Sequence, residues 1–143
     1  MKTDYKRIKK FILVGGSAAV VNLGLMALLV ELFGFEGYFF KNLANLISME
    51  TSILYAFICN RIWTWYDAPK KEGKKLVGQF FLFNLAVLAG VLVRIGLFAL
   101  FEFYGLFYLL NVTLGIGVAA ILDFILYDKI VFRRKAVSLK KMI

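Results

Sequence analysis

The chain of 143 residues is 62% hydrophobic, with a mean hydropathy of +0.79 and a formal net charge of +9. Soluble domains contain about 45–50% apolar residues, so this composition excludes an ordinary soluble domain and indicates a protein surrounded by lipid. The single cysteine, Cys59, excludes an intrachain disulfide and a cysteine metal cluster. The lack of histidine disfavours hydrolase and metalloenzyme chemistry, so neither a cofactor nor a metal is expected.

Four apolar segments follow one another along the chain, at about residues 11–33, 42–64, 78–101 and 106–131. Each reaches the roughly 20 residues needed to cross a hydrocarbon core about 30 Å thick. A backbone in lipid must satisfy its own hydrogen bonds, so each segment is predicted to be a helix. The expected fold class is an all-α integral membrane protein, with residues 1–143 forming a single transmembrane domain.

The basic residues predict how these helices are oriented. They gather at the two chain ends and near the connection at residues 66–77, whereas the two hairpin tips contain only Lys41. The positive-inside rule then predicts that both termini and the connection 66–77 lie in the cytoplasm. Trp63 and Trp65, just before this connection, are predicted to anchor the second helix at the membrane interface.

The sequence also indicates an internal duplication. Residues 56–65 (AFICNRIWTW) align with residues 123–132 (DFILYDKIVF), and residues 10–13 align with residues 79–82. Each half would be a hairpin that starts and ends on the cytoplasmic side, so the predicted repeat is parallel rather than inverted.

Small residues at four-residue spacing predict where the helices touch. Such residues let helix backbones approach closely in lipid. The longest series lies in the second segment, at Ala44, Ser48, Ser52 and Ala56. Shorter pairs occur in the other segments, at Gly15 and Ala19, Ala86 and Gly90, and Gly115 and Ala119. Asparagines within the segments, among them Asn22, Asn45 and Asn60, serve either as hydrogen-bonding contacts between helices or as ligand contacts.

Glu50, Arg94 and Asp123 carry charge near the middle of their segments. A charge at that depth costs about 2.5–3.5 kcal/mol even on insertion scales, so it needs a partner or a polar cavity. Glu50 and Arg94 have similar expected depths, which leaves two interpretations open. They form a structural salt bridge between two helices, or they line a cavity with a cation for an anionic group and a carboxylate for sugar hydroxyls or coupling.

Arg61 shares a helical stripe with Glu50 and lies at the inner interface. Its planar guanidinium suits a phosphate group, and the alternative is a positive-inside anchor with no ligand. The basic clusters at the chain ends are explained by orientation and by attraction to anionic lipid, so nucleic acid is not an expected partner.

Two motifs resemble those of a known family. Lys10-Phe11-Ile12-Leu13-Val14-Gly15-Gly16, followed by a span with Asn22, resembles the start of the GtrA-like family, and Asn60-Arg61-Ile62-Trp63-Thr64-Trp65 resembles its Asn-Arg-x-Trp-x-aromatic element. The resemblance covers about residues 7–134. It implies a flippase, without enzymatic activity, that carries a polyprenyl-phosphate-linked monosaccharide from the inner to the outer leaflet of a prokaryotic cytoplasmic membrane. The sugar would serve cell-surface polysaccharide glycosylation, with a membrane glycosyltransferase as partner and a homodimer or larger assembly.

On this interpretation Arg61 captures the phosphodiester, and the head group then moves toward Arg94 and Glu50. The full set of predicted substrate-binding residues is Arg61, Arg94, Glu50, Asn60, Asn22, Asn45 and Asp123.

Two rival functions remain open. The first is an accessory subunit that anchors a membrane glycosyltransferase near its lipid substrate. The second is a small multidrug exporter, which the sequence disfavours because Asn22 stands where such exporters place a carboxylate, and Arg94 would repel cationic drugs.

Overall fold

The computed structural model describes residues 5–35 and 37–133, and this part of the chain is helical without strands. Four helices are long and apolar enough to span a membrane: Tyr5–Leu32, Gly37–Thr64, Lys74–Phe103 and Leu110–Val131. The chain is therefore a multi-pass membrane protein, and the predicted fold class is confirmed. Lys2 and the basic residues at positions 134, 135, 140 and 141, which contribute to the predicted charge at the chain ends, lie outside the described residues.

Three of the four spanning helices end in a short π-helix. Helix α1 (Tyr5–Ala27) continues into η1 (Leu28–Leu32), α2 (Gly37–Cys59) into η2 (Asn60–Thr64), and α4 (Tyr108–Leu126) into η3 (Tyr127–Val131). Helix α3 (Lys74–Phe103) has no such ending. The π-turns were not predicted, because their i→i+5 hydrogen bonds leave no trace in hydropathy.

The first three helices begin before the apolar segments that predicted them, at Tyr5, Gly37 and Lys74. Lys41, which the sequence placed in a hairpin tip, lies inside α2 with its side chain exposed. Hydropathy marks only the part of a helix that contacts hydrocarbon, whereas main-chain hydrogen bonding continues into the polar interface.

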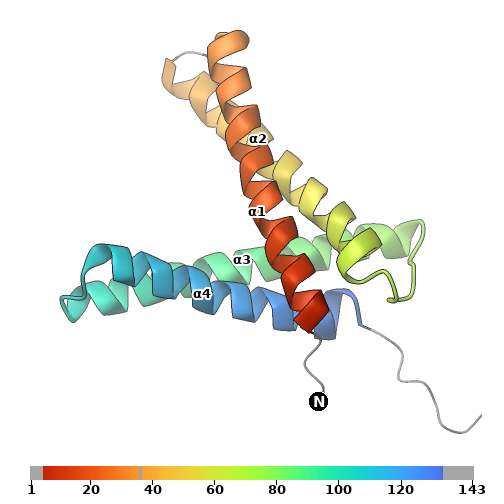
Figure 1. Ribbon diagram of the computed structural model, residues 1–143. Helices are drawn as coiled ribbons and strands as arrows, with labels where there is room; N and C mark the ends of the chain where they lie inside the picture. The colour runs from red at the N-terminus through yellow and green to blue at the C-terminus, as the bar shows by residue number, and fades with distance from the viewer. Residues whose placement is uncertain (1–4, 36, 134–143) are drawn as a thin grey trace, which may run out of the picture. The chain divides into compact units, whose positions relative to one another are not determined.

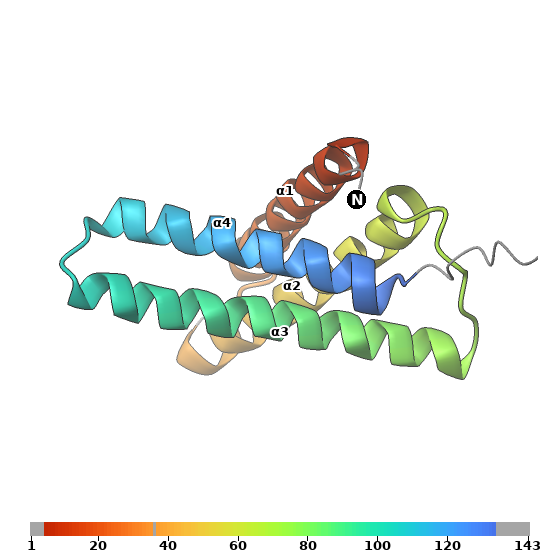
Figure 2. The ribbon, with the colours of Figure 1, turned by 90° about the horizontal axis from the view of Figure 1, so that it is seen from below.

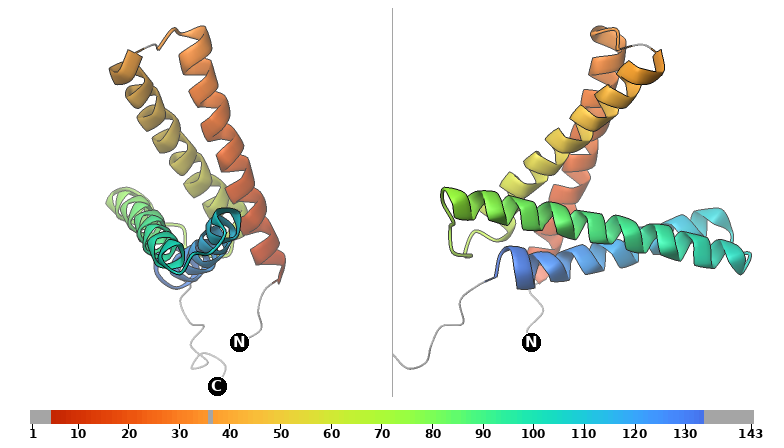
Figure 3. Two further views of the ribbon diagram at one scale, coloured as in Figure 1. Left: turned by 90° about the vertical axis from the view of Figure 1, so that its left-hand side faces the viewer. Right: turned by 180° about the vertical axis from the view of Figure 1, so that it is seen from behind.

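The chain divides into two compact units, residues 1–66 and 67–143. In the first unit α1 packs against α2, and in the second α3 packs against α4. Each pair is an antiparallel hairpin, the first best seen in Figures 1 and 3 and the second in Figure 2. The units coincide with the two halves indicated by the sequence, while their parallel arrangement stays a prediction.

Small residues of α2 lie inside the first hairpin, as their spacing predicts. Ala44 and Ser48 are fully buried. The Ser48 hydroxyl donates to the Ala44 carbonyl at 2.6 Å, and the Tyr55 hydroxyl of α2 donates to Ser17 Oγ of α1 at 3.2 Å. The hydroxyl of Ser48 is thus satisfied within its own helix, which removes the penalty of burying it.

The small residues of α1 behave differently. Gly15 and Ala19 are exposed, and a Cβ added at Gly15 would meet no atom within 4 Å. Helix α1 therefore contacts α2 through other residues. Four-residue spacing of small residues shows that a helix face could pack closely, but it does not show whether that face is the one in contact.

The two hairpins close in the same way at the end that carries η2 or η3. Lys10 Nζ of α1 donates to the Trp63 carbonyl at 3.2 Å, and Gln79 Nε2 of α3 donates to the Val131 carbonyl at 2.9 Å. Carbonyls in the last turn of a helix lack a donor in the helix itself. A side chain from the first helix of each hairpin supplies that donor.

We expect Ala44→Leu to lower the free energy of unfolding by about 1–3 kcal/mol, because a larger side chain overfills a closely packed site. The measurement is unfolding in mixed micelles by titration with SDS, followed by circular dichroism. Ala19→Leu is the matched control in the same hairpin, since Ala19 is exposed. Equal stabilities of Ala44→Leu and wild type would show that the α1–α2 contact does not depend on a small residue at position 44.

Candidate ligand-binding site

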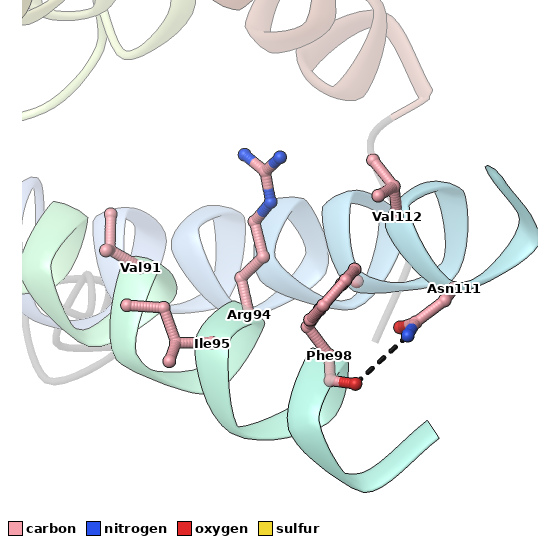
Figure 4. A pocket seen from close by; sticks show the side chains of 7 residues that line it. Val91, Arg94, Ile95, Phe98, Asn111 and Val112 are labelled. Atoms are coloured by element: carbon pink, nitrogen blue, oxygen red, sulfur yellow. Dashed lines mark hydrogen bonds between the residues drawn. The ribbon is translucent and has the colours of Figure 1, made fainter. Parts of the chain in front are cut away.

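A pocket of about 360 Å³ opens along the contact between α3 and α4, here called the α3–α4 seam. Its walls are largely apolar, and Figure 4 shows the side chains of Val91, Ile95, Phe98 and Val112 around it. Two polar residues also line it, Arg94 and Asn111. Small-molecule sites have volumes of about 300–1,000 Å³ and combine apolar walls with a few polar groups, so this pocket has the size and lining of a small-ligand site.

Arg94 lines this pocket from α3. Its stem lies against Gly115 of α4, where an added Cβ would be 3.4 Å from Arg94 Cγ and 3.8 Å from the Arg94 carbonyl oxygen. Figure 4 shows the guanidinium extending away from both helix backbones. Within the described part of the second unit, no hydrogen bond or ion pair engages the guanidinium. It is therefore available there to an anionic ligand.

Asn111 joins α4 to α3 at the end of the pocket farther from Asp123. The residue is fully buried, and its Nδ2 donates across the seam to the Phe98 carbonyl at 3.0 Å (Figure 4). Its Oδ1 is buried and has no hydrogen-bond partner among the described residues. An unpaired buried acceptor is costly, and a ligand that donates a hydrogen bond would relieve that cost.

Asp123 of α4 lies against Gly90 of α3, a residue that the sequence identified only as a packing position. A Cβ added at Gly90 would lie 2.5 Å from Asp123 Oδ1 and 3.0 Å from Asp123 Cγ. Asp123 Oδ1 is also buried without a hydrogen-bond partner in the described part of the chain. Only glycine at position 90 leaves room for the carboxylate in this orientation. The signal that could have revealed Gly90 is its place one helical turn from Arg94.

The charges of the second hairpin follow a reciprocal pattern. Arg94 is the charged residue of positions 76–101 and Asp123 is that of positions 110–127. Each faces a glycine of the opposite helix, with Arg94 against Gly115 and Asp123 against Gly90. Gly90 and Arg94 are four residues apart, or about 6 Å along the helix axis. The seam thus places a cation and a carboxylate about one turn apart, and no ion pair joins them in the described structure.

The sequence pairs Arg94 with Glu50 by depth, whereas the structure shows Arg94 on a seam shared with Asp123. Glu50 belongs to the first unit, and its predicted pairing with Arg94 stays a prediction. Depth along a helix gives no direction around its axis, so depth alone did not reveal that Asp123 lies on this seam.

Of the predicted substrate-binding residues, Arg94 lines the pocket, whereas Asp123 lies on the seam outside the pocket lining. The remaining predicted residues belong to the first unit. Glu50 and Asn45 are exposed, Asn22 and Arg61 are partly exposed, and Asn60 is buried. Asn60 Oδ1 has no hydrogen-bond partner among the described residues. The ligand-binding roles of these residues stay predictions.

The two tryptophans at the end of α2 differ in environment. Trp63 is 45% exposed, and Lys10 Nζ lies 5.6 Å from its ring centroid and 5.0 Å from that of Tyr66, within the range of cation–π attraction. Trp65 is 1% exposed, and its ring stands edge-on to that of Phe11 at 6.2 Å. The side chain of Trp63 is therefore open to the surroundings, whereas Trp65 packs inside the protein. Interfacial anchoring by both stays a prediction.

Four spanning helices in two hairpins, with a cation-bearing pocket on one seam, define a small polytopic membrane protein with a candidate site for an anionic ligand. Residues 10–132 match the family described as GtrA/DPMS, transmembrane domain, and the chain belongs to this family. The family predicted from the two motifs is confirmed.

One curated relative is a dolichol-phosphate mannosyltransferase of Pyrococcus furiosus. The chain is 34% identical to it over 113 residues, which are 79% of this chain and 30% of that protein. The chain thus spans less than a third of the length of this relative.

Proposed function

We propose that this protein translocates a polyprenyl-phosphate-linked monosaccharide from the inner to the outer leaflet for cell-surface polysaccharide glycosylation. The observation that carries this proposal is Arg94, an arginine in the apolar part of a spanning helix that lines a pocket. A cation at that depth is costly and marks a ligand path by default. The guanidinium fork binds a phosphate through two parallel hydrogen bonds, which suits a lipid phosphodiester.

The relative from Pyrococcus furiosus supports the same class of ligand. Its name combines a lipid phosphate, dolichol phosphate, with transfer of the sugar mannose. A chain that shares a segment with this protein would meet a lipid of the same kind: an anionic phosphate, a sugar rich in hydroxyl groups, and a long apolar tail.

The proposed path keeps the tail in lipid while the head group follows protein. Exposed apolar side chains on both helices of the second hairpin face the surroundings, among them Leu92 (60% exposed) and Ile121 (64% exposed). The phosphodiester is first captured by Arg61 and then bound by Arg94, while Asp123 and Asn111 accept hydrogen bonds from sugar hydroxyls.

The cellular setting follows from the same proposal. The protein lies in the cytoplasmic membrane of a prokaryote with both termini and residues 66–77 in the cytoplasm. A membrane glycosyltransferase charges the lipid at the inner face, and two or more copies of the chain assemble around the path. The protein itself moves the lipid-linked sugar without chemical change.

The test is transbilayer movement in liposomes that contain the purified protein. A fluorescent polyprenyl-phosphate hexose is placed in both leaflets, and a membrane-impermeant reagent reports the fraction that reaches the outer face with time. Rapid and complete access with the protein, against half access in protein-free liposomes, is the expected result. Half access in both, with the protein folded in the liposomes, would contradict translocation.

The relative also favours a second candidate, an accessory subunit of a membrane glycosyltransferase. The matching segment is 30% of the mannosyltransferase, so a segment of this family occurs within a sugar-transfer enzyme. Removing the protein from cells separates the two functions. Loss of a flippase leaves the lipid-linked sugar in the inner leaflet, whereas loss of an accessory subunit lowers its formation.

A further inference from the structure

We propose that one face of α1 is the contact surface for α1 of a second copy of this chain, with Asn22 of each copy bonded to Asn22 of the other across a twofold axis. The proposed function includes two or more copies, and this inference assigns the surface that joins two of them. Its test measures contact between copies and does not depend on lipid movement.

Six residues form a continuous stripe along α1. Successive members are four or three positions apart, which keeps them within about 80° of one another around an α-helix. On the side of α1 that contacts α2, Val14 is buried and Ser17 Oγ accepts from the Tyr55 hydroxyl. Val14 and Ser17 lie about 120° and 180° around the helix from the middle of the stripe. The members, none of which is buried, are Ile8, Ile12, Gly15, Ala19, Asn22 and Met26.

Asn22 is the polar member of the stripe. It lies near the middle of the spanning helix Tyr5–Leu32, and its side chain makes no hydrogen bond within the described part of the chain. A primary amide has two donors and an acceptor. Hydrocarbon offers no water to satisfy them, so such a group is stabilised by a polar partner on another helix. The described part of the first hairpin does not provide that partner.

A second copy of α1 provides the partner by symmetry. Copies inserted in the same orientation have parallel α1 helices, and a twofold axis along the membrane normal places each Asn22 at the depth of the other. Each amide then donates to its counterpart and accepts from it. A paired asparagine in a helix seam also fixes the parallel register of two helices. The asparagines of the second hairpin, Asn84 and Asn111, instead donate to α3 carbonyls through their Nδ2 atoms.

The charge of α1 fits contact with its own copy. Residues 11–30 carry no charge, whereas the apolar segments of the other spanning helices contain Glu50, Arg94 and Asp123. A twofold contact through a face with such a residue brings two like charges together, which is unfavourable in a medium of low dielectric constant. Helix α1 can pair with itself without this cost.

Gly15 and Ala19 allow the close approach that this contact needs. They lie in the middle of the stripe, and both are exposed in the first hairpin. A Cβ added at Gly15 would meet no atom within 4 Å, so packing within the single chain does not require glycine at that position. Small residues on a helix face let two backbones come close in lipid. The two residues, which are not used against α2, therefore serve the contact between copies.

Cysteine cross-linking in membranes tests which face of α1 meets a second copy. Ala19→Cys and Val20→Cys are made separately in the full chain together with Cys59→Ser, so that each variant has a single thiol. Val20 is the matched control, because it is 70% exposed and lies about 120° from the middle of the stripe. Mild oxidation is expected to give at least about fivefold more disulfide-linked dimer from Ala19→Cys, since a disulfide needs Cα atoms within about 7 Å.

Energy transfer between donor-labelled and acceptor-labelled copies in liposomes, with the labels on Cys59, measures the affinity of the dimer. Asn22→Leu is expected to weaken it about tenfold by removing the hydrogen bonds between the amides, whereas Asn22→Gln keeps an amide and should retain most of the affinity. Gly15→Leu should also weaken the dimer at least about tenfold by separating the backbones. Gly24→Leu is its control, because a Cβ at Gly24 meets no atom within 4 Å and the residue lies about 160° from the middle of the stripe.

Equal cross-linking at positions 19 and 20, or none at position 19, overturns the contact surface. Wild-type energy transfer in Asn22→Leu overturns the pairing of Asn22. If the stripe instead packs against another helix of the same chain, Ala19→Cys gives no dimer and the proposal fails. Dilution into micelles separates the copies, so unfolding of Ala19→Leu in micelles reports the α1–α2 hairpin alone. A dimer that moves no lipid keeps this contact and loses translocation, whereas lipid movement without cross-linking at position 19 does the reverse.

Discussion

Arg94→Ala is expected to slow movement of the lipid-linked sugar at least ~100-fold, because it removes two charge-assisted hydrogen bonds of about 1.5–3 kcal/mol each. Arg94 lines the pocket, and its stem lies against Gly115 without an ion pair within the described part of the second unit. The loss of the guanidinium is therefore expected to weaken ligand binding more than it lowers the stability of the α3–α4 hairpin. Initial rates of transbilayer movement, at equal amounts of reconstituted protein, measure the effect.

Two further variants define the role of Arg94. Arg94→Lys keeps the charge but loses the paired geometry, so an intermediate rate is expected. Lys41→Ala removes an exposed cation of α2 outside the proposed site and should move lipid at the wild-type rate. The structural interpretation, a salt bridge to Glu50, predicts instead that Arg94→Ala and Glu50→Ala lower the free energy of unfolding together. A folded Arg94→Ala protein with a wild-type rate would contradict the ligand role.

Phe83→Ala is expected to lower the free energy of unfolding by about 3 kcal/mol, the value typical of a buried phenylalanine. Phe83 is 1% exposed, stacks on Tyr127 with ring centroids 4.4 Å apart, and meets the edge of Phe132 at 6.3 Å. Helix contacts in lipid depend on close packing rather than on a hydrophobic drive, so a void at this point removes a main contact of the second hairpin. Titration with SDS, followed by circular dichroism, measures the loss.

Phe81→Ala provides the control for this prediction. Phe81 lies two residues away on the same helix and is 62% exposed, so the same atoms are removed from the lipid-facing side. Its unfolding free energy should stay near that of wild type. Equal losses in the two variants would show that the effect comes from lost apolar surface in general rather than from the aromatic cluster of the seam.

The sequence by itself determined the class of the protein and its family. Four apolar stretches of sufficient length must form helices, because a backbone in lipid has only itself to bond to. The motif at residues 60–65 and the opening at residues 10–16 identified the family that residues 10–132 match. Arg94 and Asp123 were recognisable as candidate site residues for the same reason: charge in an apolar segment is conspicuous without any structure.

Only the tertiary structure decided how these residues are arranged. It placed Asp123 against Gly90 and Arg94 against Gly115, buried Trp65 and exposed Gly15. In lipid both faces of a helix are apolar, so hydropathy does not mark the side that meets a neighbour. The register between α3 and α4 joins residues from 13 to 52 positions apart, and it is set by which side chains fit together rather than by local sequence.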